Sequence, residues 1–247
     1  MKGNEIMNNV EFEVYGDFAL FSDPNFKASG AKTSYLIPTY EAIKGVCKSI
    51  YWKPTFVWVI DEVRIMNPIK TESMGVRFLK DCWKGKTDEV DLETYMYLKD
   101  VKYQVKAHIE WNTNRKELFL DRNMTKHISI INRMIEKGGR RDVFLGTREC
   151  QAYVEPCKYN SGEGYYDNDN TLEEDEMFHS FTYADEAYST ETQGWLTKNF
   201  WQPKIEYGKI KFCTPARCKH ERLHEMDVKP FGVEYNNFTI EEVAEEV

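Results

Sequence analysis

The sequence predicts an α+β fold, and three observations support this prediction. Two stretches of the chain each run from strand to helix to strand, and the second follows the first. The C-terminal part is polar and holds short aromatic-rich pieces, which indicates a smaller region made mostly of strands. Two strand–helix–strand units of this kind make a ferredoxin-like (RRM-like) domain. We therefore expect a ferredoxin-like N-terminal domain over residues 1–155 and a mostly β region over residues 156–247.

The first unit begins where apolar and charged residues alternate over Val10–Val14, a pattern typical of a strand with one buried face. A helix is expected after Thr39, a suitable N-cap residue, because apolar residues then recur at helical spacing. This helix should end near Tyr51, since Pro54 disfavours helical geometry at the residue before it. β-branched and aromatic residues over 56–66 predict the second strand.

The second unit comes after residues 66–93, which have mixed polarity and no clear period. We interpret that stretch as a long loop or an irregular insertion. Residues 101–111 show the clearest alternation in the chain and predict a strand. A helix is expected over residues 128–135, with the glycine pair at 138–139 as its C-terminal stop. Residues 143–154 then predict a last strand that extends past a glycine.

Three short strands are expected in the C-terminal part, within residues 178–183, 195–201 and 205–212. Residues 241–247 have the composition of an acidic, frayed tail.

The composition excludes several classes of protein. Hydrophobic residues make up 41% of the chain, which excludes disorder over most of its length. The longest apolar run, Phe56–Ile60, is five residues, whereas a membrane helix needs roughly 18. The first thirty residues show no secretion signal, and six scattered cysteines are typical of free thiols. We therefore expect a cytoplasmic protein without a membrane partner.

Charge is distributed unevenly along the chain. The net charge of −8 divides into +3 for residues 1–150 and −11 for residues 151–247. Within the first part, residues 101–150 hold 11 basic and 6 acidic side chains. A local basic surface that binds nucleic acid is compatible with an acidic protein, although an ordinary solvated face gives the same composition.

One short motif suggests a metal site. Residues His220, Glu221 and His224 form an HExxH pattern, which on a helix would place two imidazoles and a carboxylate around zinc. Cys213 and Cys218 lie just before it, so a mixed cysteine and histidine site is conceivable. The segment is highly charged, unlike the helix of a zinc peptidase. We expect a solvated helix or loop there, with a zinc-binding protein or metallopeptidase as the alternative.

A second constellation consists of Tyr51, Lys126 and His127. The expected topology brings the end of the first helix and the start of the second to loops that flank one sheet. From spacing alone, the favoured explanation is structural: a half-buried aromatic at a helix end and two residues in the first turn of a helix.

Three blocks of sequence, taken together and in this order, carry a family resemblance. The first comprises Val14–Phe21, Ser34–Thr39, Gly45 and Ser49–Pro54, the second Asp121–Asn123 with Lys126-His127, and the third Gly138–Gly146 with Arg148–Cys150. They resemble the subtype I-C (Dvulg) branch of the fifth CRISPR-associated protein family, within the RAMP superfamily of ferredoxin-like RNA-binding proteins. The resemblance extends over residues 10–157 and fades in the acidic C-terminal part.

The resemblance implies an endoribonuclease that cleaves CRISPR precursor RNA at the repeat hairpin and remains on the 5′ handle. It implies Tyr51, Lys126 and His127 as the catalytic residues, and no cofactor. It also implies assembly with the repeated backbone subunits and the large subunit of a type I-C surveillance complex. A non-catalytic subunit that only binds the 5′ handle is the first alternative, and the zinc protein described above is the second.

The implied chemistry needs no metal, because the 2′-OH of RNA can attack the adjacent phosphate and leave a 2′,3′-cyclic phosphate and a 5′-OH. This reaction needs a base, an acid and positive charge on the phosphate. A histidine and a tyrosine can each act as acid or base, so the two roles stay open between Tyr51 and His127. For RNA binding we nominate four cations in or next to the first and third matched blocks: Lys32, Arg140, Arg141 and Arg148.

Overall fold

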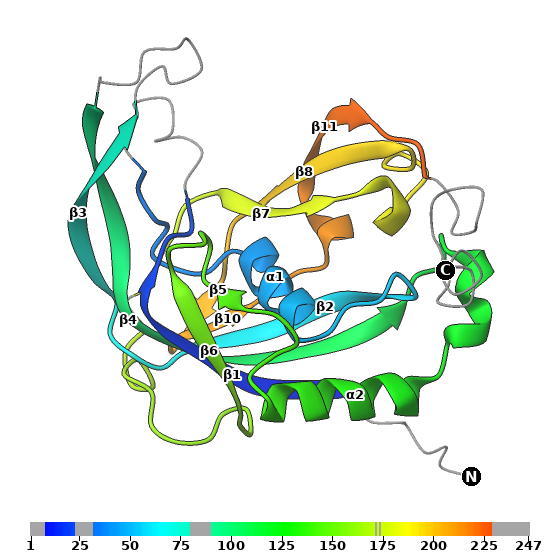
Figure 1. Cartoon of the computed structure of the whole chain (residues 1–247), viewed down its shortest axis with the longest axis horizontal. Coiled ribbons are helices and arrows are strands. Elements are labelled where there is room, and N and C mark those ends of the chain that lie inside the picture. Colours follow the sequence, from blue (N-terminus) through cyan, green and yellow to red (C-terminus); the bar gives the residue numbers. More distant parts are fainter. Residues whose placement is uncertain (1–7, 23–31, 80–89, 171, 173, 229–247) are drawn as a thin grey trace, which may run out of the picture.

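A computed structural model describes residues 8–22, 32–79, 90–170, 172 and 174–228. Its central layer is an antiparallel sheet built from two strand–helix–strand units (Figure 1). In chain order the elements of the two units are β1 (Asn9–Ala19), α1 (Tyr40–Ile50), β2 (Phe56–Ile65), β4 (Val90–Trp111), α2 (Met124–Glu136) and β6 (Gln151–Pro156).

The strand order β6-β1-β4-β2 gives the sheet its topology. β4 lies between β1 and β2 and pairs antiparallel with both, so that β1 and β2 run parallel to each other. β1 in turn lies between β4 and β6 and pairs antiparallel with both, so that β4 and β6 also run parallel to each other. Each unit is therefore a split β-α-β unit, which is the defining feature of the ferredoxin-like fold. The fold class predicted from the sequence is confirmed.

α1 begins and ends where the sequence predicts, whereas α2 ends near its predicted end but begins at Met124, four residues before the predicted start. The Thr39 side chain caps α1 by accepting a hydrogen bond from the Ala42 amide, and α1 ends at Ile50. Tyr51 follows in extended conformation, with φ −161° and ψ 133°. α2 ends at Glu136, and Gly138, a member of the predicted helix-stop pair, follows in the left-handed region (φ +79°). The end of α1 thereby directs the chain through Tyr51 toward β2, and the end of α2 directs it toward residue 143.

The stretch predicted to be a loop, residues 66–93, contains regular structure instead. β3 (Lys70–Leu79) pairs with the first half of β4, from Lys70 opposite Lys99 to Leu79 opposite Val90. The prediction was wrong because neither face of this strand is deeply buried. Its described side chains alternate only between exposed and half-buried, so the sequence carries no strong period.

The single strand predicted over residues 143–154 is a hairpin. β5 (Val143–Phe144) pairs with β6, and a turn separates them at Gly146. Gly146 has φ +92°, and a Cβ there would lie 1.9 Å from the carbonyl oxygen of Leu20. Only glycine fits this position, where the turn packs directly against the end of β1. The glycine that the prediction passed over is therefore the residue that divides the strand.

The C-terminal part supplies a second sheet and completes the first. A three-stranded sheet is formed by β7 (Met177–Thr182), β8 (Trp195–Trp201) and β11 (Lys219–Glu225). β9 (Ile205–Glu206) and β10 (Lys209–Lys211) form a hairpin that joins the main sheet at β2. Single strands lie where they were predicted at 178–183 and 195–201, whereas the piece at 205–212 is the β9–β10 hairpin. The predicted tail at 241–247 lies outside the described residues. The boundary at residue 155 stays a prediction.

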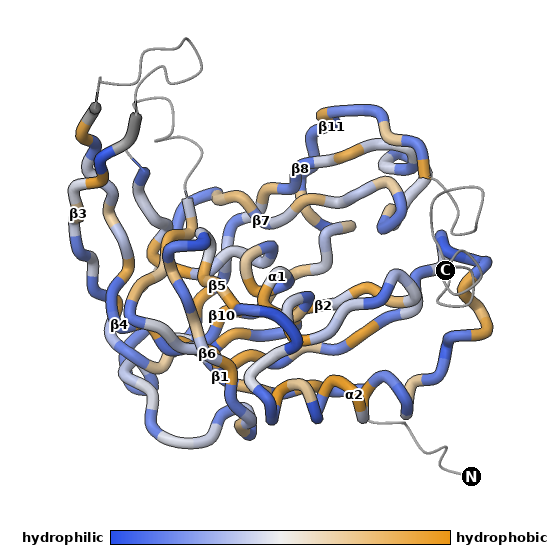
Figure 2. The backbone as a smooth tube through the Cα atoms, viewed as in Figure 1, coloured by the Kyte–Doolittle hydropathy of each residue, from blue (hydrophilic) through white to orange (hydrophobic). Residues whose placement is uncertain are grey.

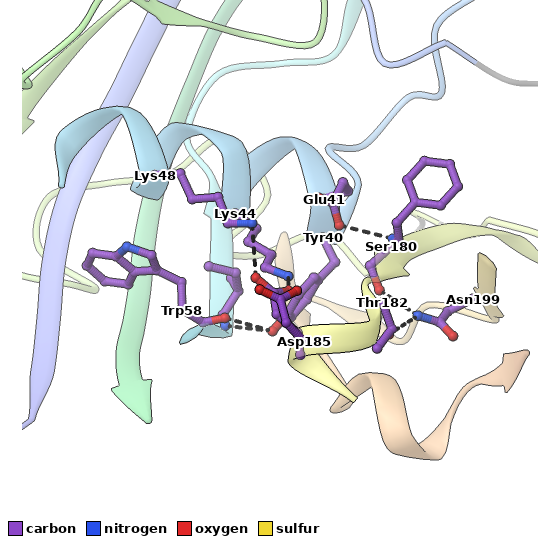
Figure 3. A network of polar contacts seen from close by, with 12 residues as sticks. Tyr40, Glu41, Lys44, Lys48, Trp58, Ser180, Thr182, Asp185 and Asn199 are labelled. Carbon is purple, nitrogen blue, oxygen red and sulfur yellow. Dashed lines mark hydrogen bonds and ion pairs between the residues drawn. The ribbon is translucent and has the colours of Figure 1, made fainter. Parts of the chain in front are cut away.

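α1 lies between the main sheet and the three-stranded sheet (Figure 1), and polar contacts fix it there (Figure 3). The Tyr40 hydroxyl is within hydrogen-bond distance of β2, and the Glu41 carboxylate accepts from the amide of Phe181 on β7. Lys44 is buried and forms an ion pair with Glu186, which also pairs with Lys48 at 3.2 Å. None of the helices in the described part of the chain is long and apolar enough to cross a membrane.

Candidate active site

Tyr51 and His127 form the centre of the candidate site. Tyr51 caps the end of α1, and His127 lies in the first turn of α2, which begins after Asn123. The Tyr51 hydroxyl is 3.2 Å from Nδ1 of His127. His127 Nε2 is 2.9 Å from the backbone carbonyl oxygen of Asp121, which can only accept. Nε2 therefore carries the proton, and Nδ1 accepts the hydrogen bond that the Tyr51 hydroxyl donates.

The Asp121 carboxylate joins the third predicted residue to this pair. It forms an ion pair with Lys126 and accepts a hydrogen bond from the Thr55 hydroxyl at 2.7 Å. Its Oδ2 is 3.6 Å from His127 Nε2. Partial burial opposes ionisation of Asp121, but the hydrogen bonds from Lys126 and Thr55 outweigh it and lower its pKa. The structure thus brings Tyr51, Lys126 and His127 together around one carboxylate.

The three side chains differ in their access to solvent. His127 is fully buried, and its ring lies against the rings of Phe56 and Trp111 at centroid distances of 5.3 and 5.8 Å. Tyr51 is 5% exposed, whereas the Lys126 side chain is 48% exposed. Of the three side chains, Lys126 is therefore the one that a bound molecule can reach most readily, whereas Tyr51 is almost completely and His127 completely enclosed.

Burial and the negative charge of Asp121 raise the pKa of Tyr51, and the cations Lys126 and Arg140 partly offset this. The Tyr51 hydroxyl is consequently protonated at neutral pH and available as a hydrogen-bond donor. Because the charge of Arg140 is close enough to lower the pKa of Tyr51, Arg140 lies near the site. The Arg140 and Arg141 amides both donate to the carbonyl oxygen of Ser49 at 3.1 Å, so this segment lies against the last turn of α1.

The other two nominated cations lie elsewhere. Lys32 lies over the ring of Tyr95 on β4, with its ammonium 4.8 Å from the ring centroid. The pKa of Glu149 is lowered by hydrogen bonds from its own backbone and from Thr147, and further by the positive charge of Lys32. Lys32 therefore lies near Glu149, the residue that follows Arg148. Arg140, Arg141 and Arg148 are exposed, and none of them forms an ion pair with another described residue. The four cations thus form two groups, of which one flanks Tyr51.

The HExxH segment is neither a helix nor a loop, as was expected, but the strand β11. All its residues are exposed, and Figure 2 shows the strand almost entirely in hydrophilic colours. Residues four apart along a strand are separated by about 13 Å, so His220 and His224 cannot bind one metal ion. The charged side chains that argued against a peptidase face solvent at the edge of the three-stranded sheet.

Comparisons with known proteins identify the family. A family model described as CRISPR-associated protein (Cas_Cas5) matches residues 10–213. The chain belongs to the Cas5d family. This confirms the resemblance seen in the sequence.

Named members of the Cas5d family include two curated relatives called CRISPR pre-crRNA endoribonuclease Cas5d. The protein of Mannheimia succiniciproducens is 29% identical over 168 residues, covering 61% of this chain and 67% of the relative. That of Thermus thermophilus is 30% identical over 162 residues, covering 61% and 65%. A crystal structure of a CRISPR-associated protein has a TM-score of 0.68 and 37% identity, and the match covers 85% of this chain and 94% of that one.

Two residues near the candidate site were quoted in the sequence blocks but given no role. Asp121 connects the three predicted residues, and its place before the N-cap residue Asn123 was the available signal. Trp52 follows Tyr51 and is 41% exposed although it is large and aromatic. Exposed aromatic rings of this kind can stack on nucleobases.

Proposed function

We propose that this chain is a metal-independent endoribonuclease that cleaves CRISPR precursor RNA at the repeat hairpin. In this proposal the protein remains bound to the 5′ handle as a subunit of a type I-C surveillance complex and acts in the cytoplasm. Membership of the Cas5d family, with relatives named pre-crRNA endoribonucleases, supports this function. The observation that carries it is the hydrogen-bonded series from the Asp121 carbonyl through His127 to the Tyr51 hydroxyl.

This arrangement favours a definite division of roles between Tyr51 and His127. The Tyr51 hydroxyl accepts the proton of the attacking 2′-OH and passes its own proton to Nδ1 of His127. The 2′ oxygen bonds to the phosphorus atom, and the bond from phosphorus to the 5′ oxygen breaks. His127 then carries a positive charge, which the Asp121 carbonyl and carboxylate stabilise. A raised pKa of Tyr51 suits this relay, because no stable phenolate has to form.

The phosphate undergoing attack gains negative charge and needs cations. Lys126 is half-exposed beside Tyr51, and Arg140 lies near enough to affect the Tyr51 pKa. Both can contact the scissile phosphate, and the Lys126 ammonium is also a proton donor for the leaving 5′ oxygen. Trp52 offers a stacking surface for a neighbouring base.

Cleavage of a repeat hairpin by the full chain tests the proposal against its main alternative. With divalent ions absent and chelator present during the assay, we expect a cleaved product that ends in a 2′,3′-cyclic phosphate and a fragment with a 5′-OH. Tight binding of an intact hairpin would instead support the non-catalytic handle-binding subunit. A product with a 3′-OH and a 5′-phosphate would point to water as the nucleophile and contradict the mechanism.

Charge reversal of Arg140 and Arg141 to glutamate is expected to weaken hairpin binding and to flatten its salt dependence. Each lost phosphate contact lowers the slope of log affinity against log salt by roughly 0.7 to 0.9. A matched control reverses Lys204 and Lys219, two lysines of the acidic C-terminal part, and so makes the same change in net charge. Equal slopes for the two variants would show that the arginines make no specific phosphate contact.

The partners of the proposed complex follow from charge and size. A local basic surface on a chain of 247 residues can bind a handle but not a whole guide RNA, so other subunits must cover the remainder. The acidic part after residue 155 disfavours RNA, and its exposed aromatic side chains, such as Tyr165 and Tyr188, suit contact with the backbone and large subunits.

A further inference from the structure

Two cysteines and a histidine meet at a point that the proposed RNA chemistry does not use. Cys213 and Cys218 enclose the short helix η5 (Pro215–Arg217), and their Sγ atoms are 3.5 Å apart. His179 comes from β7, more than thirty positions earlier in the chain. Its ligand nitrogen and the two Sγ atoms all lie within 4.8 Å of one another. We propose that Cys213, Cys218 and His179 bind a zinc ion.

The distance between the sulfur atoms supports a metal site over a disulfide. Two thiolates at about 2.3 Å from a tetrahedral zinc ion are about 3.8 Å apart, whereas bonded disulfide sulfurs are about 2.05 Å apart. The observed 3.5 Å is close to the zinc value. Four intervening residues between the cysteines also agree with the usual spacing of paired zinc ligands.

His179 is held in place as a metal ligand would be. It is fully buried, and its ring stacks on Tyr40 of α1 at a centroid distance of 4.4 Å. Nε2 lies on the cysteine side, 3.1 Å from the carbonyl oxygen of Cys213. Nδ1 is 2.8 Å from the Ser180 hydroxyl, which accepts from Asn199. Histidines that bind metals commonly have their second nitrogen fixed by such a partner, so only a small rearrangement is needed.

The three protein ligands leave one coordination position for water. Cys213 is only partly buried, so this position can reach solvent, whereas Cys218 and His179 lie inside. The ligand set therefore differs from the HExxH histidines, which are exposed on β11.

The expected role of this zinc ion is structural. It would join the loop around η5 to β7 and, through the ring stack on Tyr40, to the start of α1. Tyr51 follows Tyr40 by eleven positions, a distance of about 16 Å along a helix. Zinc binding should therefore stabilise the packing of the three-stranded sheet on α1 without taking part in the RNA chemistry.

Metal content of the untagged full chain, purified under reducing conditions, tests the proposal. Native mass spectrometry is expected to find about one zinc ion per chain. Cobalt replacing zinc should give the charge-transfer absorption of a cobalt–thiolate bond. Cys213→Ser, Cys218→Ser and His179→Gln should each lose the ion, whereas the control Cys157→Ser, at a partly buried cysteine outside the cluster, should keep it.

Two results would overturn the site. One is a reduced wild-type chain that takes up neither zinc nor cobalt when either ion is supplied. The other is a peptide map in which Cys213 and Cys218 are joined by a disulfide in the freshly isolated protein. If the variants fold poorly, the metal content and cobalt spectrum of the wild-type chain still decide. Neither measurement depends on RNA cleavage, so failure here leaves the proposed endoribonuclease untouched.

Discussion

Replacing His127 with alanine is expected to lower the rate of hairpin cleavage by roughly 100-fold to 10,000-fold, the usual effect of losing an acid–base group. The variant loses the acceptor that takes the proton of Tyr51 in the proposed relay. Affinity for the hairpin should change little, because His127 is fully buried and cannot touch the RNA backbone directly. Single-turnover cleavage and equilibrium binding, measured on the same preparations, separate the two effects.

Tyr51→Phe gives a second, gentler test of the same relay, because it removes only one hydroxyl group. We expect a loss similar to that of His127→Ala, and a double variant that is little worse than either single one. Two residues that pass one proton in series act as a unit, so their effects are not additive. If the losses multiply instead, Tyr51 and His127 act separately and the relay is wrong.

The burial of His127 requires controls for folding. Alanine leaves a cavity beside Phe56 and Trp111, so thermal unfolding is measured for each variant, and His127→Gln retains a polar side chain of similar size. His220→Ala, at an exposed histidine on β11, should cleave at the wild-type rate. Wild-type cleavage by folded His127→Ala and Tyr51→Phe would place the active site elsewhere.

The sequence predicted the central layer because its signals are local and its faces are clearly divided. Every second residue from Val101 to Ile109, in the second half of β4, is buried, and the alternation was readable without any partner strand. Thr39 and Gly138 mark helix ends through capping and a left-handed turn, which depend on single residue types. These features required no knowledge of tertiary contacts.

Elements that depend on distant contacts were predicted poorly. Gly146 divides a strand because its Cα lies against Leu20, over a hundred residues earlier. β3 is a strand because it pairs with β4, although its own pattern is weak. β11 carries the HExxH pattern of zinc-peptidase helices, but pairing with β8 makes it an edge strand. Tertiary pairing overrides local pattern in each of these cases.

The candidate site likewise combines features that the sequence predicted with features that depend on distant contacts. Family resemblance selected Tyr51, Lys126 and His127, and the ends of α1 and α2 bring them together. The sequence could not indicate that His127 is buried behind Tyr51, since burial depends on Phe56 and Trp111 from the sheet. It also could not connect His179 to Cys213 and Cys218, because nothing in the spacing links β7 to the loop around η5.

A chain that ends at residue 155 is expected not to fold, because the first part buries two cations whose partners lie beyond that point. Lys44 and Arg64 are each only 2% exposed. Lys44 pairs with Glu186, and Arg64 pairs with Asp167 at 2.6 Å while donating to backbone carbonyls at 161 and 162. Leaving one buried charge unpaired costs about 3–5 kcal/mol, and a whole domain is stable by only about 5–15 kcal/mol.

Single substitutions in the full chain measure each pair without removing the second part. We expect Glu186→Gln to lower the free energy of unfolding by about 3 kcal/mol, because it leaves the Lys44 ammonium buried between α1 and the segment after β7. Asp167→Asn should cost less, since the Asp167 side chain is 33% exposed and Arg64 keeps its backbone acceptors. Glu176→Gln is the matched control: its partner Lys219 is 76% exposed, and a change below about 1 kcal/mol is expected.

Denaturant unfolding of the three variants, compared with circular dichroism of the truncated chain, tests the argument. A chain ending at residue 155 that unfolds cooperatively would show that residues 1–155 form an independent domain, and the two buried cations would then have found solvent or new partners.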